Sequence, residues 1–301
     1  MAKKISDSGI NEKFQSRPKR IIEKDGSFNI IKKGGAPRNL YQQLIAMNWP
    51  RFFFTTLMFY LGVNLVFACA YFVIGVEYLN GVPEDRPLAG FLYCFFFSVQ
   101  TFTTVGYGAI HPVGLLANAV ATIEAMFGLM GFALITGLLY GKFSRPDSKL
   151  KFSENVLFHK EGDKYEMHFQ MINARDTLII EPSVRVLLKL YHHKKKLRNF
   201  YNLDLRISKI MFFPTNWRIV HEITEKSPLY SLKEEDLIDM DVEIIILFQG
   251  YDESFNQQIY VTHSYGDEQI LWNKHFLPSY NTDEDGNTVL DMETIDAFEN
   301  D

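Results

Sequence analysis

The segment Thr-Val-Gly-Tyr-Gly at residues 104–108 lies between two apolar segments that are each long enough to cross a lipid bilayer. Residues 52–76 contain no Asp, Glu, Lys or Arg, and residues 113–141 contain one such residue, Glu124. At about 1.5 Å per residue, a helix over either segment exceeds the roughly 30 Å thickness of the hydrocarbon layer. The two segments therefore predict transmembrane helices and restrict the chain to membrane folds.

A third apolar stretch, residues 88–103, is short for a span and runs directly into residues 104–108. Glycine-rich backbone cannot face lipid without hydrogen-bond partners, so a re-entrant helix is the economical arrangement. We predict a first transmembrane helix over about 50–76, a pore helix over about 88–103 and a second transmembrane helix over about 113–142. A buried core helix is the alternative for each run, but three in succession beside this segment make that interpretation the weaker one.

The glycines of residues 104–108 indicate what the segment does. Gly106 and Gly108 permit backbone conformations that side chains disfavour, so successive carbonyl groups can point in one direction. With the Thr104 hydroxyl, such carbonyls can replace the hydration shell of a potassium ion, as in potassium selectivity filters of this sequence. The predicted filter residues are Thr104, Val105, Gly106, Tyr107 and Gly108, with potassium ions at the first four. One filter strand per chain predicts a homotetramer, because a ring of carbonyls needs several copies.

Charge predicts the topology. Residues 1–51 carry eleven Lys or Arg and four acids, whereas residues 77–86 carry three acids and one Arg. Basic residues favour the cytoplasmic side, so both termini are expected in the cytoplasm and the short acidic loop outside.

The carboxyl-terminal half reads as β structure. Apolar and polar residues alternate at residues 165–171, 203–207, 242–248 and 259–261, and turn signals such as Asp285-Gly286 separate such runs. We predict an antiparallel β-sandwich, and hence an α+β membrane protein. The expected organisation is a cytoplasmic segment over 1–37, an interfacial helix over 38–49, a pore domain over 50–146 and a cytoplasmic sandwich over 147–301. We find no catalytic constellation, cofactor motif or nucleic-acid motif, so an enzyme is not expected and potassium is the expected permeant ligand.

Residues 97–108, Phe-Ser-Val-Gln-Thr-Phe-Thr-Thr-Val-Gly-Tyr-Gly, resemble the pore of inward-rectifier potassium channels (Kir). Residues 20–29, 142–146 and 269–272 (Gln-Ile-Leu-Trp) extend the likeness, which is greatest to the prokaryotic KirBac branch. The resemblance implies a tetrameric two-span pore over an immunoglobulin-like cytoplasmic sandwich, in a prokaryotic inner membrane.

The resemblance also implies a gate in the second transmembrane helix. Tyr140 aligns with the bulky residue that closes the helix bundle in the family, although an interfacial aromatic anchor is the alternative. Phe132 lies about two turns away on the same face and stands where strongly rectifying members carry an acid, so weak block by intracellular cations is expected. Glu124 is assigned to the cavity near the filter, with bracing of the filter from behind as the structural alternative.

Basic residues at the expected inner membrane surface are candidates for lipid binding. By resemblance, residues 38–49 form a slide helix along that surface. Arg51, Lys142 and Arg145 would then lie at headgroup depth, where each attracts anionic lipid by roughly 1 kcal/mol. Solvated basic charges with no regulatory role are the alternative.

The leading functional hypothesis is passive, potassium-selective conduction through a gated tetramer. Two other classes remain open: a membrane-anchored cytoplasmic binding module, and an ion-translocating subunit of a larger transporter.

Overall fold

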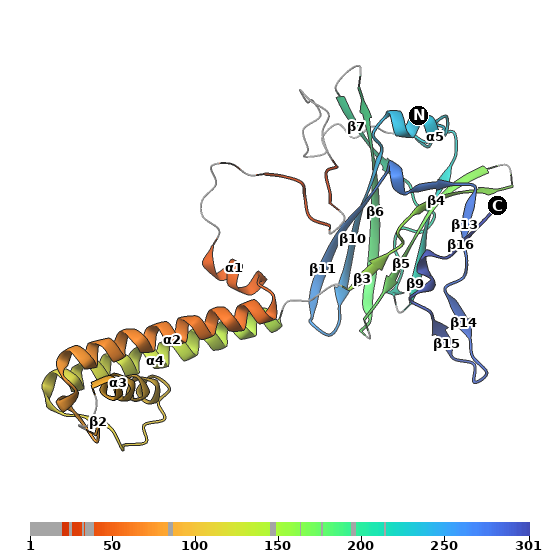
Figure 1. Cartoon of the computed structure of the whole chain (residues 1–301). Helices are drawn as coiled ribbons and strands as arrows, with labels where there is room; N and C mark the ends of the chain where they lie inside the picture. Colours follow the sequence, from red (N-terminus) through yellow and green to blue (C-terminus); the bar gives the residue numbers. More distant parts are fainter. Residues whose placement is uncertain are drawn as a thin grey trace. The chain divides into compact units, whose positions relative to one another are not determined.

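The computed structural model describes residues 20–23, 26–31, 33, 39–83, 87–144, 149–162, 164–175, 177–193, 197–213 and 215–301 (Figure 1). The chain divides into two compact units. One unit comprises Met1–Lys33 with Pro146–Asp301, and the other comprises Gly34–Arg145. The amino-terminal segment therefore belongs with the carboxyl-terminal half.

The pore unit, Gly34–Arg145, is helical. It contains α1 (Leu40–Ala46), α2 (Trp49–Ile74), α3 (Pro87–Phe102) and α4 (Gly114–Phe143). Within the described residues, α2 and α4 are the two helices long and apolar enough to cross a membrane, and they run side by side (Figure 1). Most of their large apolar side chains are exposed on the single chain, as expected of surfaces that face lipid or other subunits.

Local sequence signals set the ends of these helices. The Asn39 side chain accepts a hydrogen bond from the Tyr41 amide at 3.2 Å and caps α1, which is shorter than the predicted 38–49. Pro50 lies in the first turn of α2, where its missing N–H costs nothing. After α2, the short strand β1 (Leu79–Asn80) pairs with β2 (His111–Pro112). The segment before α3 and the segment after residues 104–108 therefore lie side by side.

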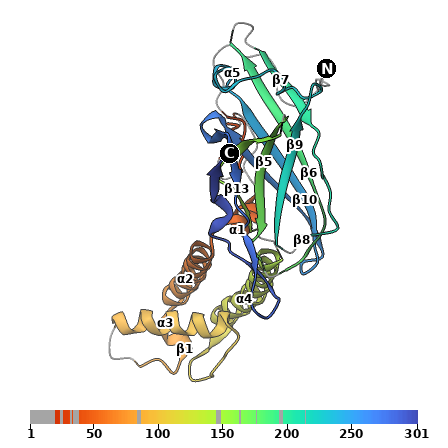
Figure 2. The same cartoon turned by 90° about the vertical axis from the view of Figure 1, so that its right-hand side faces the viewer.

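The second unit is a β-sandwich of two five-stranded sheets (Figure 2). The first sheet has β11 (Gln257–Gly266), β10 (Glu243–Asp252), β6 (Ile179–His192) and β7 (Leu197–Leu203) in that order, with β8 (Phe212–Phe213) beside β6. The second has β12 (Ile270–Trp272), β4 (Val156–Glu161), β5 (Lys164–Asn173) and β3 (Leu150–Phe152), with β9 (Asn216–Ile223) beside β5.

One apolar core lies between the two sheets. The alternating residues Met167 and Phe169 of β5 and Ile244 and Ile246 of β10 are fully buried in it. The predicted alternation at 165–171 and 242–248 therefore marks core-facing positions of central strands.

Smaller elements complete this unit. They are β13 (Lys274–Phe276) paired with β16 (Phe298–Asn300), β14 (Tyr280–Thr282) paired with β15 (Thr288–Leu290), and α5 (Glu234–Asp239). The hairpin turn predicted at Asp285-Gly286 is confirmed, because it joins β14 to β15.

Two strand predictions were wrong in detail. The sandwich is not purely antiparallel, since β12 pairs in parallel with β4. The predicted strand at residues 203–207 ends at Leu203, after which the Arg206 amide donates to the carbonyl of Val220 in the other sheet. The alternating apolar residues there belong to a connection that touches β9 and then returns to β6 of the first sheet at β8.

The amino-terminal segment is fastened to β10 by a buried carboxylate. The amides of Ile21 and Ile22 donate to Glu243 at 2.8 and 3.1 Å, and the Lys189 ammonium donates to the same carboxylate at 2.9 Å. The Ser264 hydroxyl donates to the Ile22 carbonyl at 2.9 Å. A buried charge is tolerated only when it is paired and hydrogen-bonded, and Glu243 meets both conditions.

Candidate functional site

The backbone of residues 104–106 turns its amides toward the end of α3. The Thr104 amide donates to the Thr101 carbonyl at 3.0 Å, and the amides of Val105 and Gly106 donate to the Gln100 carbonyl at 3.0 and 3.3 Å. In a trans peptide the N–H and the preceding C=O point in opposite directions. The carbonyls that precede these three amides therefore point away from α3, out of the single chain.

The sign of φ alternates along the same segment. Thr104, Gly106 and Gly108 have φ of 58°, 55° and 80°, whereas Val105 and Tyr107 are not among the residues with positive φ. In a regular strand successive carbonyls point to opposite sides. The alternating sign of φ instead lets successive carbonyls point to the same side. Glycine accepts positive φ freely, but a β-branched threonine does so only where its surroundings impose it, as at binding sites.

A buried polar cluster joins the three helices behind this segment. The Tyr71 hydroxyl of α2 donates to Glu124 of α4 at 2.6 Å, and Ser98 of α3 hydrogen-bonds the other oxygen of the same carboxylate. Ser98 also lies 3.0 Å from the side-chain oxygen of Asn64.

This cluster corrects the assignment of Glu124 to the cavity. The Glu124 side chain has no exposed surface even on the single chain, so it braces α3 from behind.

A glycine allows α4 to approach the end of α3. A Cβ atom at Gly128 would lie 2.1 Å from the Phe102 carbonyl oxygen, and one at Gly131 would lie 3.2 Å from the Phe102 ring. At Gly137 a Cβ would meet nothing within 4 Å. Close packing against the pore helix therefore explains Gly128, whereas Gly137 lacks such a contact within the chain.

The two predicted gate residues lie on the open surface of α4. Phe132 is 71% exposed and Tyr140 is 76% exposed on the single chain. Their spacing of eight residues places them about two turns apart on one face of the helix. The structure thus leaves both side chains free to meet other subunits or lipid.

The predicted lipid-binding residues have different surroundings. The Lys142 ammonium donates to the carbonyls of Ile45, at 3.2 Å, and Met47, and it lies 4.8 Å from the centre of the Trp49 ring. It therefore ties the end of α1 to α4, a role that the sequence did not indicate. Arg51 is exposed on α2, and Arg145 lies outside the described residues.

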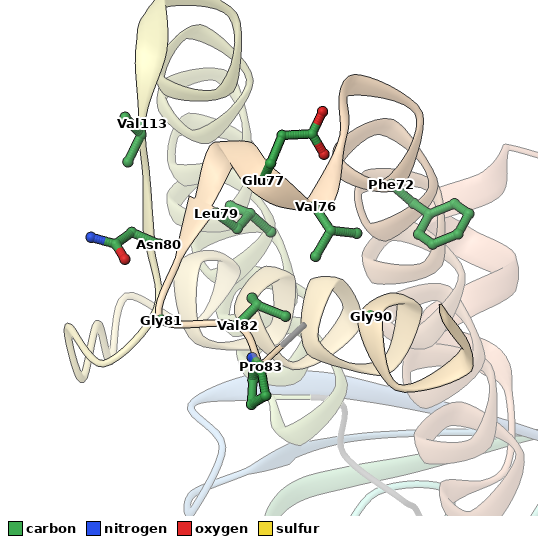
Figure 3. A pocket seen from close by; sticks show the side chains of 10 residues that line it. All are labelled: Phe72, Val76, Glu77, Leu79, Asn80, Gly81, Val82, Pro83, Gly90 and Val113. Atoms are coloured by element: carbon green, nitrogen blue, oxygen red, sulfur yellow. The ribbon is translucent and has the colours of Figure 1, made fainter. Parts of the chain in front are cut away.

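A hollow of about 720 Å³ lies where α2 leads toward α3 (Figure 3). Its lining includes Phe72, Val76 and Leu79, and Glu77 is the one ionisable side chain among the labelled residues. The carboxamide of Asn80 also lines it, so its polar side chains are those of Glu77 and Asn80.

Comparisons with known proteins agree with these two units. Residues 52–144 match the ion channel family, and residues 150–300 match the inward rectifier potassium channel C-terminal domain. The chain is 34% identical to the inward rectifier potassium channel Kirbac3.1 of Paramagnetospirillum magnetotacticum, over 92% of this chain and 95% of that protein. It is 25% identical to the human G protein-activated inward rectifier potassium channel 4, over 86% of this chain and 68% of that protein. It is 27% identical to the human inward rectifier potassium channel 4, over 88% and 69%.

Two membrane helices around a re-entrant helix, with a β-sandwich in the same chain, define an integral membrane protein of the ion-channel class. The chain belongs to the inward rectifier potassium channel family. The predicted fold class and the resemblance to the KirBac branch are confirmed. The relatives are ion channels, which confirms the prediction that the chain is not an enzyme.

Proposed function

We propose that four copies of the chain form a potassium-selective pore that conducts passively in a prokaryotic inner membrane, with both termini in the cytoplasm. Ions would bind the backbone carbonyls of the filter, at Thr104, Val105, Gly106 and Tyr107. Membership of the family supports the ion. The two membrane helices of the described residues put both termini on one side, and the basic residues of 1–51 favour the cytoplasmic side.

The direction of the filter backbone carries this proposal. The amides of residues 104–106 donate to carbonyls of α3, so the carbonyls of Thr103, Thr104 and Val105 point away from α3, and two of these belong to proposed binding positions. Around a four-fold axis these carbonyls would form stacked rings that replace the hydration shell of potassium. The carboxyl end of α3 points its partial negative charge toward the same region, which favours a cation.

Tyr140 and Phe132 are the proposed gate. Four large side chains that meet on an axis exclude water, and a dewetted constriction stops ions without any charge. Their exposure on α4 supports this role. An apolar residue at 132 offers no site for a cationic blocker, so block by intracellular spermine or magnesium should be shallow in patch recordings.

Anionic lipid is the proposed modulator, acting at the inner surface through Arg51 and Arg145. Lys142 would act differently, because its ammonium already binds carbonyls at the end of α1. In this arrangement Lys142 couples α1, the predicted slide helix, to α4. Attraction of the neighbouring arginines to anionic lipid would then move α1 and α4 together. Charge reversal at Arg51 should therefore alter the dependence of flux on anionic lipid, and an unchanged dependence would count against this role.

The direct test is ion flux into liposomes that contain the purified tetramer. Rubidium and potassium should enter, sodium should be excluded, and barium should block, because it matches potassium in size and binds the carbonyl cage tightly. Gly106→Ala should abolish flux, since a side chain disfavours φ of 55°. Gly62→Ala in α2, where a Cβ would meet nothing within 4 Å, is the matched control. Equal entry of sodium and potassium would contradict the proposal.

The same preparation separates the other two functional classes. A binding module anchored by its helices would pass no rubidium in any lipid. A subunit of a larger transporter would need a partner chain for flux, so a lone tetramer that conducts excludes it.

A further inference from the structure

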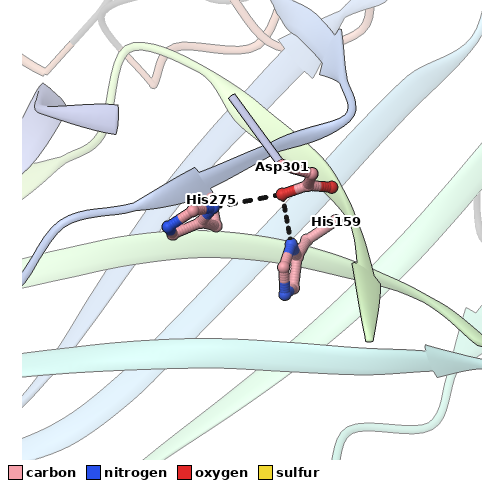
Figure 4. Close-up of side chains that lie close together, drawn as sticks. All are labelled: His159, His275 and Asp301. Atoms are coloured by element: carbon pink, nitrogen blue, oxygen red, sulfur yellow. Dashed lines mark hydrogen bonds and ion pairs between the residues drawn. The ribbon is translucent and has the colours of Figure 1, made fainter. Parts of the chain in front are cut away.

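Two histidines and an aspartate converge at one edge of the β-sandwich (Figure 4). His159 lies on β4, His275 lies on β13, and Asp301 follows β16. The Nδ1 atoms of His159 and His275 lie 2.5 and 3.1 Å from the same oxygen, Oδ1 of Asp301. The three candidate ligand atoms lie within 4.8 Å of one another, and each side chain is less than one third exposed.

A second carboxylate holds the outer nitrogen of each ring. The Nε2 atom of His159 lies 3.0 Å from Glu161, and the Nε2 atom of His275 lies 2.8 Å from Glu299. When Nδ1 of either ring binds a metal, the outer carboxylate can accept the proton that stays on Nε2. Metal-binding histidines are oriented in this way by carboxylates that do not touch the metal.

Backbone pairing fixes the positions of these side chains. His275 and Glu299 are direct partners in the β13–β16 ladder, and the Lys160 amide donates to the second oxygen of Asp301 at 2.9 Å. The Asp301 amide donates to the Asn273 carbonyl at 3.1 Å. The ligands therefore stand on rigid elements, which reduces the cost of gathering them around an ion.

We propose that this cluster is a binding site for a divalent transition metal of the zinc type. His159 Nδ1, His275 Nδ1 and the Asp301 carboxylate are the ligands, with water at a fourth position. With bonds of about 2.0–2.1 Å, the ligand atoms of a tetrahedral zinc site lie about 3.3 Å apart, so small side-chain movements suffice. Imidazole ligands favour zinc, copper or nickel over magnesium and calcium, which prefer oxygen. Three carboxylates, those of Asp301, Glu161 and Glu299, also surround the two imidazoles and favour a divalent cation.

Such a metal would fasten the end of β16 to β4. It would join two segments that are far apart in the sequence, so bound metal should raise the thermal stability of the sandwich. This consequence does not depend on the ion that the pore conducts.

The test uses the full-length tetramer in detergent, freed of any affinity tag and of metal by a chelator. Zinc is added, excess is removed by dialysis, and bound metal is measured by elemental analysis. We expect about one zinc ion per chain, lost in His159→Ala and His275→Ala. His193→Ala is the matched control, because His193 also pairs with an acid, Asp241 at 3.3 Å, but belongs to another part of the sandwich.

Glu299→Gln keeps all three ligands, so it tests the site even if the histidine variants fail to fold. It should lower zinc affinity about 10–100-fold without abolishing binding. Cobalt in place of zinc should give the intense visible absorption of a tetrahedral site, and millimolar magnesium should not displace it. The proposal is overturned if His159→Ala and His275→Ala retain the metal, if magnesium competes equally, or if the wild-type chain binds none. Those results would leave the cluster as hydrogen-bonded side chains only.

Discussion

At the scale of single residues, the carboxylate of Glu124 is the centre of hydrogen bonding behind the filter. It accepts from Tyr71 at 2.6 Å, contacts Ser98 and has no exposed surface. A buried hydroxyl that loses its acceptor costs about 1–3 kcal/mol, so the polar cluster constrains how α3 rests on α2 and α4.

Replacement of Glu124 should therefore depend on whether an acceptor remains. Glu124→Gln keeps an oxygen for Tyr71 and should change the thermal dissociation of the tetramer little. Glu124→Leu should destabilise each chain by about 1–3 kcal/mol, because the Tyr71 hydroxyl is left buried and unpaired. The double variant Tyr71→Phe with Glu124→Leu should recover part of that loss. A tetramer equally stable in Glu124→Leu and wild type would show that the cluster does not brace the helix.

His263 gives the sandwich a defined response to acid. Its ring stacks on Phe152 at 4.5 Å, and burial together with the charge of Arg20 lowers its pKa to about 4. In the unfolded chain its pKa returns to about 6.5, so the unfolded state takes up the proton first as pH falls. The free energy of unfolding should therefore decrease between about pH 6.5 and pH 4.

His263→Gln should flatten this decrease by on the order of 2 kcal/mol, at one pKa unit per about 1.4 kcal/mol. His168 and His221 also have lowered pKa values, through burial, so a slope of the same sign should remain. Unfolding measured from pH 7.5 to pH 4.5 tests this, with the partly exposed His193→Gln as control. Parallel pH profiles for the two variants would show that His263 does not contribute.

At the scale of elements, the crossing of α3 and α4 depends on the absence of one side chain. A Cβ at Gly128 would lie 2.1 Å from the Phe102 carbonyl oxygen, at the end of the pore helix next to the filter. Gly128→Ala should therefore push the helices apart and reduce rubidium flux strongly, with a loss of roughly 1–3 kcal/mol in stability.

Gly137→Ala is the control for that substitution, because the same helix has open space there. Alanine is also the better helix former by about 1 kcal/mol, so this variant should be as stable as the wild type or more so. If both variants conduct equally, the approach of α4 to Phe102 does not position the filter.

Elements with a strong local pattern could be predicted from the sequence, and their partners could not. The apolar runs give α2 and α4, which the structure places at Trp49–Ile74 and Gly114–Phe143, because lipid requires a long run without charges. The alternation at 203–207 indicates a strand, but β7 ends at Leu203 and the chain continues as a connection to β8 beside β6. Period-two alternation reports which side is buried and does not identify the neighbouring strand.

At the scale of the whole molecule, a site can be predicted from the sequence only when its residues are consecutive. The filter at 104–108 could be found because all its chemistry lies in five consecutive residues. The cluster of His159, His275 and Asp301 is assembled from β4, β13 and the residue after β16, and no spacing in the sequence signals it. Glu243 likewise gains its role only when Ile21 lies beside it.

The proposed gate is a property of the tetramer, because one Tyr140 closes nothing by itself. If four copies meet on the axis, Tyr140→Ala should widen the constriction and raise basal rubidium flux several-fold. Selectivity for potassium over sodium should stay unchanged, since the carbonyls of 104–108 are a separate structure. Flux and selectivity can be measured in the same liposomes at equal protein content.

Leu134→Ala is the matched control, because Leu134 is also exposed on α4 but two residues from Phe132 and so on another face. An interfacial anchor at Tyr140 predicts a different pattern: Tyr140→Trp and Tyr140→Ala would both leave basal flux unchanged, and only membrane insertion or stability would respond. A rise in flux with alanine and none with tryptophan supports the gate, because bulk at the axis then controls conduction. Equal flux in Tyr140→Ala, Leu134→Ala and wild type would place the constriction elsewhere in the tetramer.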